Sequence, residues 1–322
     1  MASSFLPLFA SAVVALFSWR TNAISVDSKP ADMDLWGVSA ANLTKYFDHP
    51  NATGIYHLHA PDISIAYADR RQFRDDWSLS IAVVADIPLD ERAWATKEQR
   101  ADRSFTGTKL TLQAPPRNSD NSSAAHISWT VCLIEYSPYF KKDVSALRRP
   151  NDDDNNSCSS ILSQECIAAM EEDAIKKYTG SSPDFPCHCP STDKLPACEG
   201  QMRWSGGCSA RRHNATEINT QWLDGKYDWR FIGGDRTERG NITAYNELGS
   251  IAWPTIVLWG QSPNATTGGQ GVRVNNTAKM VCMRAKNATQ GSIAPATSGG
   301  RRNTVSTVTA GFVWIAIWMM LM

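Results

Sequence analysis

Two closely spaced histidines are the first residues whose types and spacing could do chemistry. His57 and His59 are separated by one residue, so in a strand both imidazoles would lie on the same face, with Asp62 nearby. Imidazole nitrogens bind transition metals, but two ligands do not make a site, and no third can be identified in the sequence. We therefore expect structural or surface histidines here, and no metal.

A second pattern typical of metal sites is the triplet Cys187-His188-Cys189. In zinc sites about two to four residues usually separate the cysteines, whereas a single residue separates Cys187 and Cys189. The acidic run Asp152–Asp154 is not followed by the alternating oxygen ligands, glycine and distal glutamate of a calcium-binding loop. The sequence predicts oxidised cysteines at the first motif, a solvated loop at the second, and no cofactor.

Patterns of catalytic residues are also missing. Glycosidases use two carboxylates about 5 to 10 Å apart, but acid pairs at alternating strand positions are absent. Glu91 and Glu135 are single acids on or near strands, where a surface position is the usual one. The segment 205–209 resembles a serine nucleophile elbow only superficially, because it lies among cysteines. Catalytic pairs can be distant in sequence, so enzymatic activity stays uncertain; we expect none.

Tryptophans are the remaining candidates for a ligand surface, because an exposed ring can stack on the apolar face of a sugar. Four lie in alternating strand segments and are expected in the core: Trp77, Trp129, Trp253 and Trp259. Three lie in loop-like contexts and form the candidate ligand surface, although packing is the commoner role: Trp94, Trp204 and Trp222.

Strands must position most of these residues. The clearest are expected within 77–89, 127–133 and 251–259, where apolar residues recur at every second position. Weaker strands are expected at 55–60, 63–68, 108–114, 228–232, 271–275 and 278–285. Pro254 lies inside the third clear strand and predicts an edge strand or a bulge there. Strands of these lengths and separations favour an antiparallel β-sandwich.

A region of different composition interrupts the strands. Ser157 to Tyr178 has the periodicity of a helix, with Glu172–Lys176 and Asp173–Lys177 as favourable pairs one turn apart. A Pro-, Cys- and Gly-rich stretch follows to Cys208. The sequence thus predicts a mainly β protein, with one sandwich domain over 24–292 that carries a disulfide-stapled, partly helical insertion at about 150–210.

The cysteines indicate the redox environment. All eight lie inside the predicted domain: Cys132, Cys158, Cys166, Cys187, Cys189, Cys198, Cys208 and Cys282. An even number in an oxidising compartment predicts four disulfides. Cys132 and Cys282 lie in strand-like segments far apart in the chain, and we expect them to pair with each other. The other pairings stay open.

Both ends of the sequence carry apolar segments. Phe5 to Trp19, followed by Thr21-Asn22-Ala23, predicts a secretory signal peptide over 1–23. Near the other end stand Ser298, Gly299 and Gly300, a polar spacer and an apolar tail from Ala310 that is too short to span a bilayer. This is the pattern of a glycosylphosphatidylinositol (GPI) signal. It predicts attachment at Ser298 after a short stalk, 293–298, and removal of 299–322; the alternative is a tail anchor or a single membrane span.

These ends predict a protein outside the cell, on the outer leaflet of the plasma membrane or in the cell wall, with a GPI lipid as its membrane partner. In that compartment nine Asn-x-Ser/Thr motifs are glycosylation candidates: Asn42, Asn51, Asn121, Asn155, Asn214, Asn241, Asn264, Asn275 and Asn287. Without the two end segments the chain has 29 basic against 32 acidic residues. That balance argues against nucleic acid as a partner.

The cysteine spacing also carries a resemblance. The pattern C-x7-C-x20-C-x-C-x8-C-x9-C from Cys158 to Cys208, preceded by Trp-Thr-Val-Cys at 129–132, resembles uncharacterised secreted glycoproteins of filamentous ascomycete fungi, which are often GPI-anchored. The resemblance covers roughly 75–285 and implies a fungal cell surface. It implies no activity and no site residues.

Together these observations predict a GPI-anchored glycoprotein of the cell surface or cell wall with a binding or structural role. Cell-wall polysaccharide is the most concrete partner, because carbohydrate binding would use the loop tryptophans. The alternative is a cell-surface hydrolase that acts on wall polysaccharide.

Overall fold

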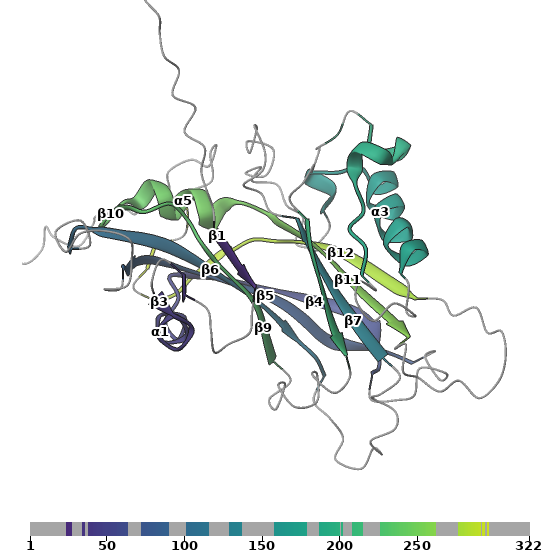
Figure 1. Ribbon diagram of the computed structural model, residues 1–322, viewed down its shortest axis with the longest axis horizontal. Helices are drawn as coiled ribbons and strands as arrows, with labels where there is room; N and C mark the ends of the chain where they lie inside the picture. Colours follow the sequence, from purple (N-terminus) through teal and green to yellow (C-terminus); the bar gives the residue numbers. More distant parts are fainter. Residues whose placement is uncertain are drawn as a thin grey trace, which may run out of the picture.

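The structure is a computed structural model, and it describes residues 24–27, 34–35, 38–63, 72–89, 101–115, 129–136, 158–178, 187–199, 201, 208–214, 226–261, 276–290, 292–293 and 295. These residues form a mainly β protein in which two antiparallel sheets pack face to face as a sandwich (Figure 1). The predicted fold class is confirmed.

The larger sheet has seven strands. Six of them follow the order β1-β9-β6-β5-β4-β13, and β10 pairs with β6. Their bounds are Ile24–Asp27 (β1), Lys226–Gly233 (β9), Arg103–Gln113 (β6), Phe73–Pro88 (β5), Ala52–Pro61 (β4), Asn287–Ala288 (β13) and Thr237–Glu238 (β10).

The smaller sheet has four strands in the order β12-β11-β7-β8. They are Thr277–Met283 (β12), Trp253–Gln261 (β11), Trp129–Tyr136 (β7) and Cys208–Asn214 (β8). Two very short strands, Asp34–Leu35 (β2) and Val38–Ser39 (β3), pair with each other. All three clear predicted strands and four of the weaker ones are present; 271–275 and all but Ile63 of 63–68 lie outside the described residues.

The expectation drawn from Pro254 was wrong. Strand β11 lies in the middle of the small sheet, between β12 and β7, and neither pairing has a register shift. Pro254 pairs with Cys282 on one side, while pairing with β7 begins only at Thr255. A proline is tolerated there because it lies at the beginning of β11, before the ladder to β7 starts.

Tryptophans fill the space between the two sheets. Trp77, Trp129, Trp253 and Trp259 are each at most 2% exposed. Trp77 from the large sheet meets Trp259 from the small sheet edge-to-face, with ring centroids 5.4 Å apart. A buried tryptophan removes about 150–250 Å² from water, or roughly 4–6 kcal/mol in transfer free energy. Their predicted place in the core is confirmed, and they hold the two sheets together.

Two helices cover the outer faces of the sheets, and a third contributes side chains to the core between them. α1 (Ala40–Tyr46) packs on the large sheet, where Leu43 and the following Phe47 join a cluster with Phe105 and Phe231. α3 (Gln164–Lys177) packs on the opposite side of the molecule, against β11 and β12 of the small sheet (Figure 1). α5 (Ile242–Ser250) contributes Tyr245 and Leu248 to the core between the sheets.

The predicted helix over 157–178 is present in two parts. A short 3-10 turn, η5 (Cys158–Ser160), precedes α3, which begins after Ser163. The Ser163 hydroxyl accepts a hydrogen bond from the Cys166 amide at 3.2 Å and so caps the helix. The pairs Glu172–Lys176 and Asp173–Lys177 form as predicted, with closest N–O distances of 2.7 and 2.9 Å.

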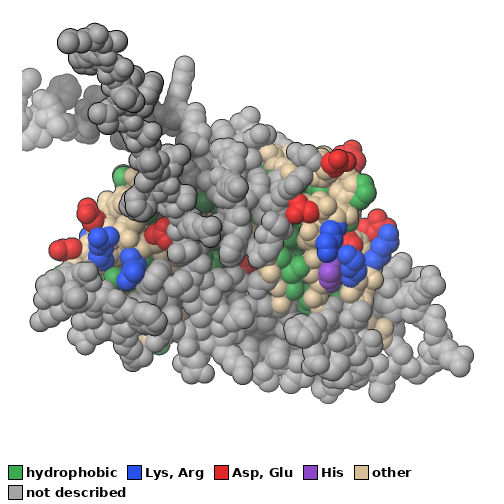
Figure 2. Space-filling model, turned by 45° about the horizontal axis from the view of Figure 1, so that its top comes forward, with side chains coloured by type: hydrophobic (Ala, Val, Ile, Leu, Met, Phe, Trp, Pro, Cys, Tyr) green, Lys and Arg blue, Asp and Glu red, His purple; other side chains and the backbone are tan. Residues whose placement is uncertain are grey.

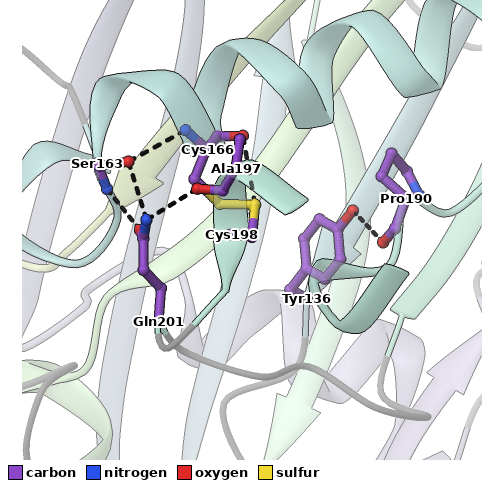
Figure 3. The surroundings of a disulfide bond; sticks show 7 residues. All are labelled: Tyr136, Ser163, Cys166, Pro190, Ala197, Cys198 and Gln201. Atoms are coloured by element: carbon purple, nitrogen blue, oxygen red, sulfur yellow. Dashed lines mark hydrogen bonds between the residues drawn. A yellow bond between two sulfur atoms is a disulfide. The ribbon is translucent and has the colours of Figure 1, made fainter. Parts of the chain in front are cut away.

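All eight cysteines are paired, which confirms four disulfides. The pairs are Cys132–Cys187, Cys158–Cys282, Cys166–Cys198 and Cys189–Cys208. Each bond fastens the 158–199 segments to the small sheet or to one another, and none reaches the large sheet. Figure 3 shows Cys166 and Cys198, where α3 meets the 3-10 turn η7 (Pro196–Cys198); a second turn, η6 (Thr192–Lys194), precedes it.

The predicted Cys132–Cys282 pair was wrong. Both side chains lie on the outer face of the small sheet, but β11 separates their strands. Cys132 is opposite Leu258 and Cys282 is opposite Pro254. The two are therefore two strand spacings apart, about 9–10 Å, and offset by four residues along β11. A disulfide needs Cα atoms within about 7 Å, so each cysteine bonds a residue of the covering layer instead.

Glu135 also departs from expectation, because it is 1% exposed rather than on the surface. It lies two residues after Leu133 and four after Val131 on β7, so it shares their face, which points into the core between the sheets. Glu91 lies outside the described residues.

Candidate ligand-binding strip

The predicted ligand surface cannot be located, because Trp94, Trp204 and Trp222 lie outside the described residues. The described part contains another surface of suitable chemistry. It consists of Ile55, His57 and His59 on β4 with Phe73 and Asp75 on β5, and we call it the His59 strip.

Alternation along β4 creates one side of the strip. Tyr56, Leu58 and Ala60 are buried between the sheets, so Ile55, His57 and His59 must lie on the outer face. Both histidines are exposed, so of the two roles expected from the sequence, structural or surface, they have the second. Ile55 is 62% exposed and Phe73 is 42% exposed, so both offer apolar surface on this face of the sheet.

His59 is held between two residues of the neighbouring strand. Its Nδ1 lies 2.7 Å from Oδ1 of Asp75, and its ring stacks on Phe73 with centroids 5.0 Å apart and planes 16° apart. The register of β4 and β5 shifts between Leu58 and Ala60, so the bulge includes His59. The result is an imidazole fixed face-on to an exposed aromatic ring.

Charged residues border the strip at the beginning of β5. Arg74 donates from Nε to Oδ1 of Asp76 at 2.9 Å, and its Nη1 lies 3.9 Å from Asp62. The hydrogen bond to Asp76 raises the pKa of Arg74, and the charges of Asp76 and Asp62 add to this against an opposing effect of burial. These contacts fix the strand that carries Phe73 and Asp75.

The strip suits binding better than catalysis. The side chains of His59 and Asp75 are 65% and 87% exposed. In catalytic triads the carboxylate that orients the histidine is buried, and exclusion of water strengthens the electrostatic effect on the reacting atoms. An exposed surface with an aromatic ring and several hydrogen-bonding groups instead fits a polar ligand that has an apolar face.

The described residues contain no group of three or more His, Cys, Asp or Glu side chains placed to hold a metal ion. Cys187 and Cys189 each form a disulfide, so the triplet offers no thiolate to zinc. His188 between them has its Nε2 3.7 Å from Asp173 of α3. It belongs to a group of charged side chains on and beside α3, seen in Figure 2 as neighbouring acidic and basic residues. The group consists of Glu172, Asp173, Lys176, Lys177 and His188.

Four of the nine sequons have described side chains. Asn241 and Asn287 are exposed, Asn42 is half-buried in α1, and Asn51 is half-buried with both ends of its carboxamide engaged. Asn214 is the last residue of β8. Asn121, Asn155, Asn264 and Asn275 lie outside the described residues, as do Asp152–Asp154, Ser298 and both terminal signals.

Among the helices of the described residues, none has the length and apolar character needed to cross a membrane. Comparison with known proteins gives no match to any family model, curated protein or solved structure.

Sequence reasoning found only half of the strip. The spacing of His57 and His59 placed both imidazoles on one face of a strand, but it left open whether they are structural or surface residues. Phe73 and Asp75 gave no signal, because their role depends on the register between β4 and β5, which the sequence does not reveal.

Proposed function

We propose that the protein is a GPI-anchored extracellular glycoprotein of the fungal cell surface or cell wall, and that it acts by binding carbohydrate. Four disulfides with no unpaired cysteine support an oxidising compartment. The signal-peptide and GPI patterns at the two ends, and the exposed sequons Asn241 and Asn287, support secretion and anchorage.

The His59 strip carries the binding part of this proposal. Phe73 offers an exposed ring next to the His59–Asp75 pair, so the apolar face of a pyranose could stack on one while its hydroxyls bond to the other. One stacking contact contributes about 0.5–1.5 kcal/mol, and each hydrogen bond a similar net amount. A single sugar would therefore bind weakly, at about millimolar Kd.

Weak single sites suit a protein displayed in many copies against a repetitive polymer. Linked binding events can raise avidity by about 10²–10⁴ over a single contact. The ligand class that fits best is thus a neutral polysaccharide of the cell wall rather than a small soluble sugar.

The binding test compares variants of the secreted form, residues 24–298, on an array of fungal and plant polysaccharides. Phe73→Ala and His59→Ala should each lower binding about two- to tenfold, the effect of losing one contact of about 0.5–1.4 kcal/mol. Glu172→Ala is the matched control, because Glu172 is an exposed residue of α3 on the other side of the molecule. Absence of binding by the parent, or equal binding by all variants, would contradict the proposal.

The anchor has its own test. Phosphatidylinositol-specific phospholipase should release the full-length protein from cells. Mass spectrometry should show that the mature polypeptide ends at Ser298. Retention on membranes together with peptides that contain Met322 would exclude the anchor.

A further inference from the structure

The last described residues attach the chain to one end of the sandwich. After β12 the chain crosses to the large sheet, where the Tyr56 hydroxyl bonds both the N–H and the C=O of Arg284, at 2.6 and 2.7 Å. β13 then pairs with the first residues of β4, Ala288 opposite Ala52. The Thr289 amide donates to the Asn51 carbonyl at 3.0 Å.

The same segment continues to α5. The Tyr245 hydroxyl donates to the Ile293 carbonyl at 2.8 Å. Pro295 packs so closely on Gly249 that a Cβ there would lie 2.3 Å from the proline ring. We call this end, formed by α5, β13 and residues 289–295, the base of the sandwich.

The base lies very near the predicted attachment residue. Only Ala296 and Thr297 stand between Pro295 and Ser298. Three residues span at most about 10–11 Å even when fully extended. The domain therefore has almost no peptide stalk, and the expected stalk over 293–298 is shortened because Ile293 and Pro295 contact α5.

Strand β4 connects the base with the His59 strip. It begins at Ala52, beside β13, and His59 follows seven residues later. At about 3.3 Å per residue, His59 and its partners Phe73 and Asp75 lie about 23 Å from the base.

Exposed apolar side chains gather in these two places. The large apolar residues that are exposed in the described part are Ile55 and Phe73 in the strip, and Ile242 and Ile293 at the base. Ile242 is 52% exposed at the beginning of α5, and Ile293 is 74% exposed beside the tether. Asn241 and Asn287 lie at the same end, so their glycans would surround this surface.

We propose that the base faces the lipid surface of the anchoring membrane and that the His59–Phe73–Asp75 end of the strip faces outward. This orientation rests on the proposed anchorage at Ser298. It follows from the short tether and from the direction of β4, and it presents the ligand-binding end about 23 Å further from the bilayer than the base.

The test uses full-length protein on cells with one clickable amino acid, at Ala288 in the base or at Asp75 in the strip. Both positions are exposed. A dye at each position is read against an acceptor in the outer leaflet. The dye at Ala288 should be quenched much more strongly than the dye at Asp75. The control inserts ten Gly/Ser residues between Thr297 and Ser298, which adds about 17 Å of flexible reach and should reduce the difference.

Each outcome separates the orientation from the anchor. Strong quenching at Ala288, weak quenching at Asp75 and a reduced difference with the linker support the orientation. Equal quenching at both sites, in protein that phospholipase releases, overturns the orientation and leaves the anchor intact. If copies of the protein crosslink to one another at position 288 and the lipid acceptor does not quench the dye there, a second copy covers the base. That result also overturns the orientation. Protein that is not lipid-linked at all overturns the proposed anchor, and this inference with it.

Discussion

Removing the Cys158–Cys282 disulfide should destabilise the protein more than removing any other. This bond closes 124 residues, whereas Cys189–Cys208 closes 19. On the chain-entropy model the first contributes about 5 kcal/mol and the second about 3 kcal/mol, because a longer loop loses more freedom in the unfolded chain. The 158–282 bond also joins the layer that carries α3 to β12, so its loss affects tertiary structure as well as chain entropy.

The variants replace both partners with alanine, so that no thiol is left unpaired. For a domain of this size, about 1 kcal/mol shifts the Tm by roughly 2–4 °C, so the 158–282 variant should melt about 10–20 °C below the parent. The 189–208 variant is the matched control and should fall by roughly 6–12 °C. Calorimetry under non-reducing conditions measures both. Equal losses, or a larger loss for the short loop, would refute the loop-length argument.

The single variant Cys282→Ala tests the pairing itself. Its partner becomes an unpaired thiol, which alkylation and peptide mass spectrometry identify. The structure predicts labelling at Cys158. Labelling at Cys132 would restore the pairing expected from sequence and would show that the small sheet is ordered differently.

Three further predictions concern single side chains. Burial raises the pKa of Glu171 against the hydrogen bond from the Met280 amide, so its contribution to stability is present at low pH and lost as pH rises through that pKa. The free energy of unfolding of Glu171→Gln, measured by urea titration, should therefore rise relative to that of the parent between pH 3 and 7. Glu171→Ala leaves the buried Met280 amide without its acceptor and should lose about 1–3 kcal/mol. A pH-independent difference for the glutamine variant would contradict this. Ser163→Ala should cost about 1–2 kcal/mol by thermal melting, because the hydroxyl caps α3, and Ser163→Thr should retain most of it. Glycopeptide mapping should find Asn51 mostly without a glycan and Asn241 glycosylated. The reason is that the Asn51 carboxamide forms hydrogen bonds with the Ala85 amide and the Ser292 hydroxyl. Full occupancy at Asn51 would show that these bonds are dispensable.

Sequence patterns predicted the elements better than their arrangement. Trp77 and Trp259 were assigned to the core because local alternation determines which face of a strand is apolar. The position of β11 could not be read in the same way, since Pro254 indicates only that one N–H is missing. A central strand tolerates this at its first residues, before its ladder to one neighbour begins. Disulfide pairing failed for a related reason: Cys132 and Cys282 both occupy strand-like segments, but strand order decides whether they meet.

The candidate site was predicted to the same extent. Local sequence placed His57 and His59 on the same face of a strand. The stacking of Phe73 on His59 depends on which residues β4 and β5 bring opposite each other, and no periodicity contains that information.

The attachment of the C-terminal segment determines how the molecule would carry a mechanical load. Tension applied at the C-terminal end would first break the contacts of Pro295 and Ile293 with α5, and would then peel β13 from β4, where two residue pairs resist. It would then reach Cys282, whose covalent bond to Cys158 transfers the pull sideways into the layer that covers the small sheet. Strand β12 therefore cannot be pulled away beyond Cys282 unless the layer that carries α3 moves with it.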